Sequence, residues 1–151
     1  MTRNLRSQRR HRYRLLAPVI SWVSQSTTEE LSTPPLNEAG VILLFSRMME
    51  DLGIIYESSP AQYPDMIGRI KTVRGFERGR IEFEFVSSNL FRHAHDPSGC
   101  NMIIYWENDL KTDKVEELDR CNVKILALSE IIENGPENQI REGGEGYSTV
   151  D

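Results

Sequence analysis

The stretch RIEFEF, residues 80–85, decides how this sequence folds, because charged and apolar residues alternate along it without exception. Successive side chains of a strand point to opposite faces, so the pattern predicts a strand with Arg80, Glu82 and Glu84 on one face and Ile81, Phe83 and Phe85 on the other. Two carboxylates on one face repel each other unless water or a cation screens their charge. The strand therefore indicates either a solvent-exposed face with Arg80 as the counter-ion, or a cation-binding site.

Further elements are expected on both sides of this strand. Their expected ranges are a helix over 37–52 that Asn37 caps, strands over 54–58 and 66–71, a short helix over 87–95, strands over 101–106 and 123–128, and a helix over 129–135. Gly75 and Gly79 are expected to form the turn that leads into the strand at 80–86, and the polar segment 107–121 is expected to be a partly helical connection. This order predicts an α/β fold with a mixed sheet and helices on its faces.

Length and composition indicate one domain in a reducing compartment. A chain of 151 residues fits one domain with tails. Two cysteines, Cys100 and Cys121, make a disulfide framework a poor fit and favour a cytoplasmic protein. No apolar run approaches the roughly 18 residues of a membrane helix, so no membrane partner is expected.

The net charge of −5 is unevenly distributed along the chain. Residues 1–16 carry no acid and six arginines, which are Arg3, Arg6, Arg9, Arg10, Arg12 and Arg14. This charge distribution and the local composition predict a basic arm and linker over 1–35, an α/β domain over 36–134 and a disordered acidic tail over 135–151. The arm has two interpretations, a phosphate-binding segment for nucleic acid or a solvated terminus.

Four carboxylates occupy positions that would suit a divalent cation. Glu38 falls in the first turn of the first helix, Asp65 precedes the second strand, and Glu82 and Glu84 lie in the third. The 17 residues between Asp65 and Glu82 suit a strand, a turn and a return, which would place the two side by side. Mg²⁺ prefers such oxygen ligands. Simpler interpretations are that Glu38 interacts only with the helix dipole and that Asp65 caps the proline-rich turn before the strand.

These residues carry a resemblance to a known family. The helix at 37–53, the pair Pro64-Asp65 and the stretch IEFE at 81–84 resemble the PD-(D/E)XK nuclease superfamily, the restriction-endonuclease-like fold. The longer pattern RIEFEF, HAHDPSGC and YWEND is similar to a small prokaryotic and phage group of that fold. The resemblance covers about residues 36–132. It implies an αβββαβ core and hydrolysis of nucleic-acid phosphodiester bonds, DNA above all, with Mg²⁺ or Mn²⁺.

The resemblance also implies roles for single residues. Asp65, Glu82 and Glu84 would hold the metal, and Glu38 would assist. The superfamily commonly has a lysine at the position of Glu84, and here Arg80, Lys71 or His95 would have to replace it. Asn101 also departs from the narrower group, which carries an aspartate there. The resemblance therefore leaves open whether the protein catalyses hydrolysis. The alternative is an inactive nuclease-fold module for nucleic-acid binding or assembly. The resemblance also allows a homodimer, since many nucleases of this fold pair to cut two strands.

The segment HAHDPSGC supports a different chemistry. His93, His95, Cys100 and Cys121 are zinc-competent ligands, so a small structural zinc domain is a second alternative. The spacing matches no standard zinc finger, and two histidines at i and i+2 of a helix would splay about 200° apart. His95 is also a candidate general base or phosphate contact. The simplest interpretation is that the histidines order an Asp96-Pro97 turn.

Overall fold

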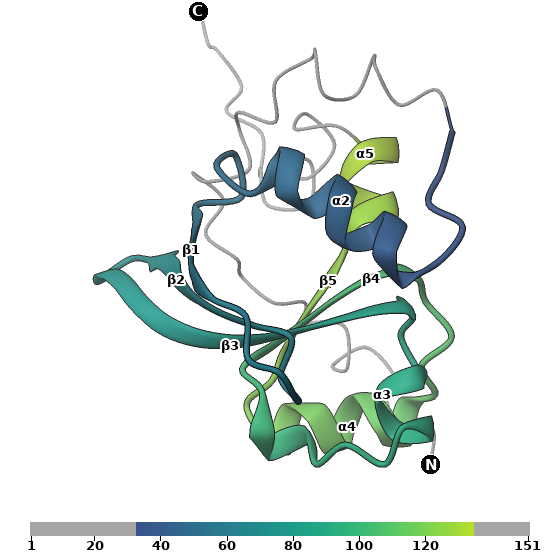
Figure 1. Ribbon diagram of the computed structural model, residues 1–151. Helices are drawn as coiled ribbons and strands as arrows, with labels where there is room; N and C mark the ends of the chain where they lie inside the picture. The colour runs from purple at the N-terminus through teal and green to yellow at the C-terminus, as the bar shows by residue number, and fades with distance from the viewer. Residues whose placement is uncertain (1–32, 135–151) are drawn as a thin grey trace, which may run out of the picture.

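A mixed sheet of five strands forms the centre of the structure (Figure 1). The computed structural model describes residues 33–134, so the arginines of the basic arm and the acidic tail lie outside the described residues. The elements are α2 (Glu38–Met48), β1 (Ile54–Ser58), β2 (Met66–Thr72), β3 (Gly75–Val86), α3 (Asn89–Arg92), a 3-10 helix η2 (Pro97–Gly99), β4 (Met102–Glu107), α4 (Thr112–Arg120), β5 (Lys124–Ala127) and α5 (Leu128–Asn134). The expected α/β fold with a mixed sheet is confirmed.

The strands lie across the sheet in chain order, from β1 to β5. β1, β2 and β3 pair antiparallel, whereas β4 and β5 continue the sheet in parallel with β3. Parallel neighbours need crossover connections, and the segments with α3 and α4 supply them. The polar connection predicted over 107–121 thus contains a defined helix. β3 belongs to both halves of the sheet and lies at its centre.

Helices cover both faces of the sheet. α2 and α5 lie on one side of it, and α3 and α4 lie on the other (Figure 1). Ile81 and Phe83 of β3 belong to the apolar cluster that includes residues of α2 and α5. Because side chains alternate along a strand, Glu82 and Glu84 point to the opposite side, where α3 and the loop after it lie.

The first helix begins as its sequence predicts. The side chain of Asn37 accepts a hydrogen bond from the main-chain N–H of Gly40 at 2.9 Å, which satisfies one of the free donors of the first turn. The helical residues end at Met48, earlier than expected, and Gly53 then adopts a left-handed φ of 66°. The buried face consists of Val41, Leu44, Phe45 and Met48. This packing fixes Glu38 at the start of a well-anchored helix.

The β2–β3 hairpin is longer than predicted. β3 begins at Gly75, which has a φ of 115°, so the turn consists of Val73 and Arg74. The prediction that Gly79 belongs to the turn is wrong, because Gly79 lies within β3 opposite Gly68 of β2. A Cβ on Gly79 would lie 2.5 Å from Ile70 Cδ1, so the glycine makes room for a core side chain. The hairpin extends beyond the helices at the left of Figure 1.

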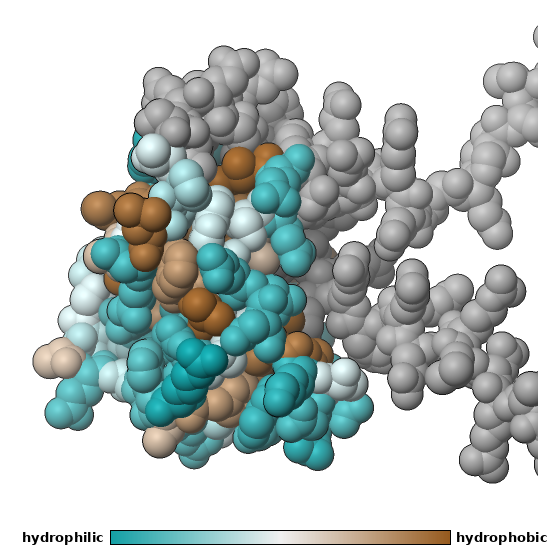
Figure 2. All heavy atoms as spheres, turned by 90° about the vertical axis from the view of Figure 1, so that its right-hand side faces the viewer, coloured by the Kyte–Doolittle hydropathy of each residue, from teal (hydrophilic) through white to brown (hydrophobic). Residues whose placement is uncertain are grey.

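The surface carries scattered apolar side chains. On the side shown in Figure 2, hydrophobic residues form separate patches among hydrophilic ones. The large apolar residues that are most exposed are Leu36, Leu43, Ile55, Tyr56, Val73 and Phe76. None of the helices in residues 33–134 is long and apolar enough to cross a membrane.

We expect Gly68→Ala to destabilise the sheet. An added Cβ would lie 2.8 Å from the main-chain oxygen of Ile55 in β1, and this backbone atom cannot move without disturbing the strand pairing. The cost should be about 1–3 kcal/mol, as for other overpacked sites, and urea unfolding measures it. Gly79→Ala is the matched comparison and should destabilise less, because its new methyl group meets the end of the Ile70 side chain, which can move, and not a backbone atom. Equal unfolding midpoints for Gly68→Ala and the unmodified protein would contradict the close approach.

Candidate metal-binding carboxylate site

Asp65, directly before β2, lies opposite Glu82 of β3. Met66 pairs with Ile81 in the β2–β3 register, so the next position brings Asp65 beside Glu82. The main-chain N–H of Asp65 donates to Glu82 Oε2 at 3.0 Å, and the N–H of Phe83 donates to Asp65 Oδ2 at 2.9 Å. The two carboxyl groups are therefore fixed by the backbone of the partner strand. Their predicted juxtaposition is confirmed.

The face of β3 that carries Glu82 and Glu84 is buried. Glu82 is 3% exposed and Glu84 is 0% exposed, so the interpretation of a solvent-exposed face is wrong. Neither carboxylate oxygen of Glu84 has a partner with hydrogen-bond geometry among the residues that the structure describes, although the Asn89 side chain lies close enough to lower its pKa. A buried polar group without a partner is costly and calls for an explanation.

Each of the two buried glutamates has one histidine beside it. His93 Nδ1 lies 3.3 Å from Glu84 Oε1, and His95 Nδ1 lies 3.2 Å from Glu82 Oε1. These are ion-pair distances without hydrogen-bond geometry, since His95 Nδ1 has no such partner within the described part of the chain. Each imidazole can neutralise a glutamate only when it is protonated.

A turn of the chain brings both histidines to the same side. The helix predicted over 87–95 ends at Arg92, and Ala94 adopts a left-handed φ of 55°. The ring centroids of His93 and His95 consequently lie only 5.7 Å apart. The expectation that the two rings splay around a helix is wrong, because the helix ends before them.

Tyr63 holds the second histidine in place. Its ring lies 4.3 Å from the ring of His95, and its hydroxyl donates to the main-chain oxygen of Asp96 at 2.8 Å. The ring occupies the space that Gly99 leaves free, since a Cβ on this glycine would meet the Tyr63 ring at 2.3 Å. The segment before Asp65 and the loop at 93–100 are thereby packed together.

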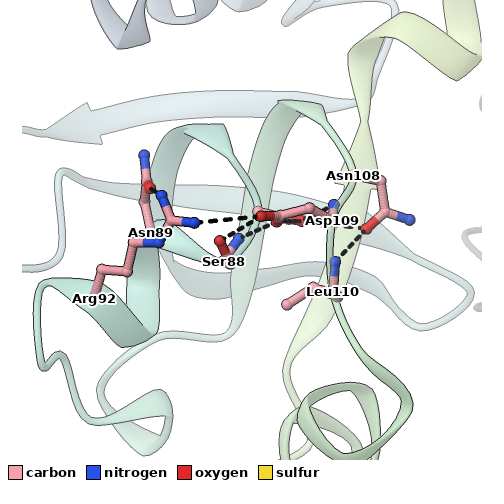
Figure 3. A network of polar contacts seen from close by, with 7 residues as sticks. Ser88, Asn89, Arg92, Asn108, Asp109 and Leu110 are labelled. Atoms are coloured by element: carbon pink, nitrogen blue, oxygen red, sulfur yellow. Dashed lines mark hydrogen bonds and ion pairs between the residues drawn. The ribbon is translucent and has the colours of Figure 1, made fainter.

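A polar network around Asp109 anchors the beginning of α3 (Figure 3). Asp109 Oδ1 accepts from the hydroxyl of Ser87 at 3.1 Å and from the N–H of Ser88 at 2.9 Å, and Oδ2 accepts from the hydroxyl of Ser88 at 2.6 Å. Arg92 adds a weaker ion pair at 3.8 Å. These bonds lower the pKa of Asp109 against the opposing effect of burial, which is the largest single influence. The network ties α3, and the histidine loop that follows it, to the end of β4.

Burial changes the charge of the two glutamates. The pKa of Glu82 rises to about 7, because burial and then the charge of Asp65 disfavour its ionised form. The pKa of Glu84 rises to about 8, with burial the first cause and the charge of Glu38 the second. Near neutral pH the pair therefore retains protons that a bound cation would displace.

Glu38 belongs to the same electrostatic cluster. Its pKa is raised, first by partial burial and then by the charge of Asp65, whereas His93 and His95 act in the opposite direction. The start of α2 thus contributes a fourth carboxyl group, as its predicted position suggested. With all four acids ionised, two protonated histidines would still leave a net charge of about −2, so the cluster favours a cation.

Two of the proposed lysine substitutes do not reach the glutamates. Arg80 Nε donates to Asn101 Oδ1 at 3.2 Å, and its Nη2 donates to the main-chain oxygen of Ser98 at 3.2 Å. Arg80 is therefore held by neutral acceptors, and the prediction that it is the local counter-ion is wrong. Lys71 pairs with Phe76 near the hairpin turn, about 20 Å along β2 from Asp65. His95 is the one candidate that lies beside the carboxylates.

The residues of the zinc alternative are not brought together. Cys100 is buried in the apolar cluster on the α3–α4 side, with Cys121 packed against it, and Cys100 Sγ donates to the main-chain oxygen of Pro97 at 3.7 Å. The histidines instead approach Glu82 and Glu84. Within residues 33–134, no group of three or more His, Cys, Asp or Glu side chains is arranged to hold a metal ion. A cation would therefore require side-chain adjustment.

Two site residues were missed from the sequence. The sequence suggests for His93 only a zinc ligand or a turn-ordering residue, although it contacts Glu84, and it suggests no role for Tyr63, which packs against His95. The position of Tyr63, two residues before Asp65, was an available signal, because neighbours of a site residue line the same end of a strand. The glycine that admits its ring, Gly99, lies 36 residues away and gave no such signal.

Stability without added metal should fall as the pH rises from about 5 to 8. Both glutamates have an ordinary pKa of 4.5 when unfolded and a raised pKa when folded. The folded state therefore binds more protons in this window, and unfolding free energy declines with pH, by on the order of 1 kcal/mol per pH unit and group. Urea unfolding across this range should show the decline. Glu84→Gln should flatten it, and the exposed Glu116→Gln should not. A profile that rises with pH would contradict the burial argument.

Gly99→Ala should displace the ring of Tyr63 and with it His95. The new methyl group would overlap the Tyr63 ring, which cannot retreat while its hydroxyl binds Asp96. We expect a loss of about 1–3 kcal/mol in stability and a changed chemical shift for the His95 imidazole. Tyr63→Phe is the control, because it keeps the ring and removes only the hydrogen bond. An unchanged His95 resonance in Gly99→Ala would show that the tyrosine does not position it.

Comparisons with known proteins add nothing to the geometry of this site. Neither the protein-family models nor the curated proteins nor the solved structures contain a match to this chain.

Proposed function

We propose that the protein is a metal-dependent nuclease that hydrolyses nucleic-acid phosphodiester bonds with Mg²⁺ or Mn²⁺. The observation that carries this proposal is Glu84, which is fully buried while both of its oxygens lack hydrogen-bond partners among the described residues. Next to it lie three more carboxyl groups, those of Glu38, Asp65 and Glu82. A divalent cation with oxygen ligands is the group that best offsets such a concentration of buried negative charge.

The arrangement of the elements supports the same proposal. The order α2, β1, β2, β3, α3 and β4 matches the αβββαβ core that the sequence resemblance implies. Asp65 directly precedes the second strand, and Glu82 lies within the third, where that superfamily places its metal-binding acids. Glu38 in the first helix joins them electrostatically. We therefore propose a restriction-endonuclease-like fold for residues 36–134.

The four carboxyl groups would divide the binding of the cation. Asp65 and Glu82 would use the oxygens that their main-chain hydrogen bonds leave free, which are Oδ1 and Oε1. Glu84 would contribute its unpartnered oxygens, and Glu38 would assist. A bound Mg²⁺ or Mn²⁺ would stabilise charge on the phosphate and lower the pKa of an attacking water.

His95 would take over the proton-handling role of the missing lysine. It lies beside Glu82, whereas Arg80 is engaged by Asn101 and Lys71 is at the other end of β2. An imidazole within reach of the site can accept the proton of an attacking water near neutral pH. Its tilted contact with the Tyr63 ring, 4.3 Å between centroids, would keep the imidazole oriented toward the carboxylates.

An inactive nucleic-acid-binding module is the second candidate. It is favoured by the glutamate at the position of the usual lysine and by the absence, among residues 33–134, of a ready-made cluster of metal ligands. In that case the fold and the nucleic-acid partner would remain, and hydrolysis would be lost.

Glu82→Ala and Asp65→Ala should abolish cleavage. Either change removes an oxygen ligand of the metal. Losing this ligand should raise the activation barrier of hydrolysis by about 3 kcal/mol, so we expect the rate to fall about 100-fold or more. Cleavage of labelled single-stranded, duplex and branched DNA with Mg²⁺ or Mn²⁺ measures it. Manganese binding, followed by electron paramagnetic resonance, should weaken in the same variants.

Glu116→Gln on the exposed side of α4 is the matched control and should cleave at the normal rate. If the unmodified protein and Glu82→Ala are equally inert on every substrate, the nuclease proposal fails. Retained DNA binding in that case would favour the inactive module.

A further inference from the structure

The β2–β3 hairpin carries a concentration of positive charge in an acidic domain. Residues 69–80 contain five lysines and arginines and one acid, whereas the rest of 33–134 contains six against sixteen. The five cations, here called the basic strip, are Arg69, Lys71, Arg74, Arg78 and Arg80. This contrast within one described region calls for a polyanionic partner.

The basic strip continues the face of the sheet that carries the carboxylates. Arg78 and Arg80 share the alternating positions of Glu82 on β3, and Arg69 lies directly opposite Arg78 on β2. The other face of the hairpin is the one buried against the α2 side, as Ile70 and Ile81 show. A molecule lying along the basic strip would therefore approach the Glu82 end of β3 on the same face of the sheet, where the loop at 93–100 covers the carboxylates.

Most of this positive charge has no acidic partner. Glu57 binds both Arg69 at 2.7 Å and Arg78 at 2.9 Å, so one carboxylate serves two guanidinium groups. Arg80 binds neutral oxygens. Within the described residues, the side chains of Lys71 and Arg74 have no polar partner.

The basic strip is open and long enough for a nucleic-acid backbone. The side chains of Arg69 and Arg78 are 59% and 72% exposed, and Phe76 beside them is 50% exposed. From Gly75 at the tip to Glu82, β3 extends about 23 Å, the length of about six or seven nucleotides of one strand of a duplex. The projecting hairpin at the left of Figure 1 leaves this surface clear of the described helices.

We propose that the basic strip binds the phosphate backbone of duplex DNA and leads it to the carboxylates at Asp65 and Glu82. The identity of the polyanion rests on the nuclease function proposed above. The charge argument for a polyanion rests on the basic strip alone. Its cations neutralise phosphates and release counterions, which makes the binding dependent on salt and independent of base sequence.

The test is DNA binding by the full chain in EDTA, where no cleavage occurs. Fluorescence anisotropy with a labelled duplex of about 20 base pairs, between about 0.05 and 0.2 M salt, gives the affinity and its salt dependence. In Lys71→Ala/Arg74→Ala, the slope of log K against log salt should become shallower by about 2, and the affinity near 0.1 M salt should fall at least about tenfold. Arg74→Ala alone should change the slope by about 1.

The matched control is Lys111→Ala/Arg120→Ala, which removes the same charge from the exposed ends of α4. Its affinity should stay within about twofold of the unmodified protein, because its cations lie off the basic strip. Thermal unfolding checks that every variant remains folded. Equal effects of the two double variants, or no effect of either, would overturn the proposal.

Binding and cleavage can fail separately. Strip-dependent binding by a protein that cleaves nothing would support the basic strip and refute the nuclease function. Cleavage together with unchanged binding in Lys71→Ala/Arg74→Ala would refute the basic strip and leave the nuclease function in place.

Discussion

Glu84 places an ionisable carboxyl group in the middle of the sheet, where water does not reach it. Removing a carboxylate from water costs several kcal/mol unless a partner compensates the charge. Burial first, and then the charges of the neighbouring acids, raise the pKa of Glu84 to about 8, although the side chain of Asn89 acts in the opposite direction. The protein therefore meets this constraint with a proton, and binding of the proposed cation would be coupled to stability.

The rest of the site depends on elements that hold this region rigid. The pairing of β2 with β3 brings Asp65 beside Glu82, and main-chain N–H groups of Asp65 and Phe83 donate to the carboxylates of Glu82 and Asp65. The histidine loop is positioned from two directions, by the Asp109 network at the beginning of α3 and by the ring of Tyr63. Side chains held in this way lose little further freedom when a ligand binds.

The acidic site and the basic strip share one face of the sheet, and in the proposed function their charges would have complementary roles. The carboxylates would repel a phosphate backbone when no cation is bound, whereas the exposed arginines and lysines attract it. A bound divalent metal ion would offset most of this negative charge and so reduce the repulsion at the end of the basic strip.

The sequence by itself determined the strand at the centre of this fold and the acids on it. Strict alternation over 80–85 assigns Glu82 and Glu84 to one face, and the 17 residues back to Asp65 place that residue opposite Glu82. It did not determine that this face is buried, because alternation is the same whether water or protein covers the charged side. α3 and the loop at 93–100 cover it, and where that loop turns depends on the early end of the helix at Arg92.

Tertiary structure alone also decided which residues serve as partners. Arg80 lies on the face of the glutamates, yet Asn101, 21 residues further on, binds it instead. Glycine is common in turns, but Gly79 lies within β3 opposite Gly68, where its missing side chain makes room for Ile70. Local sequence specifies which way a side chain points. What that side chain meets is set by segments that are distant in the chain and become neighbours only when the sheet and its helices pack together.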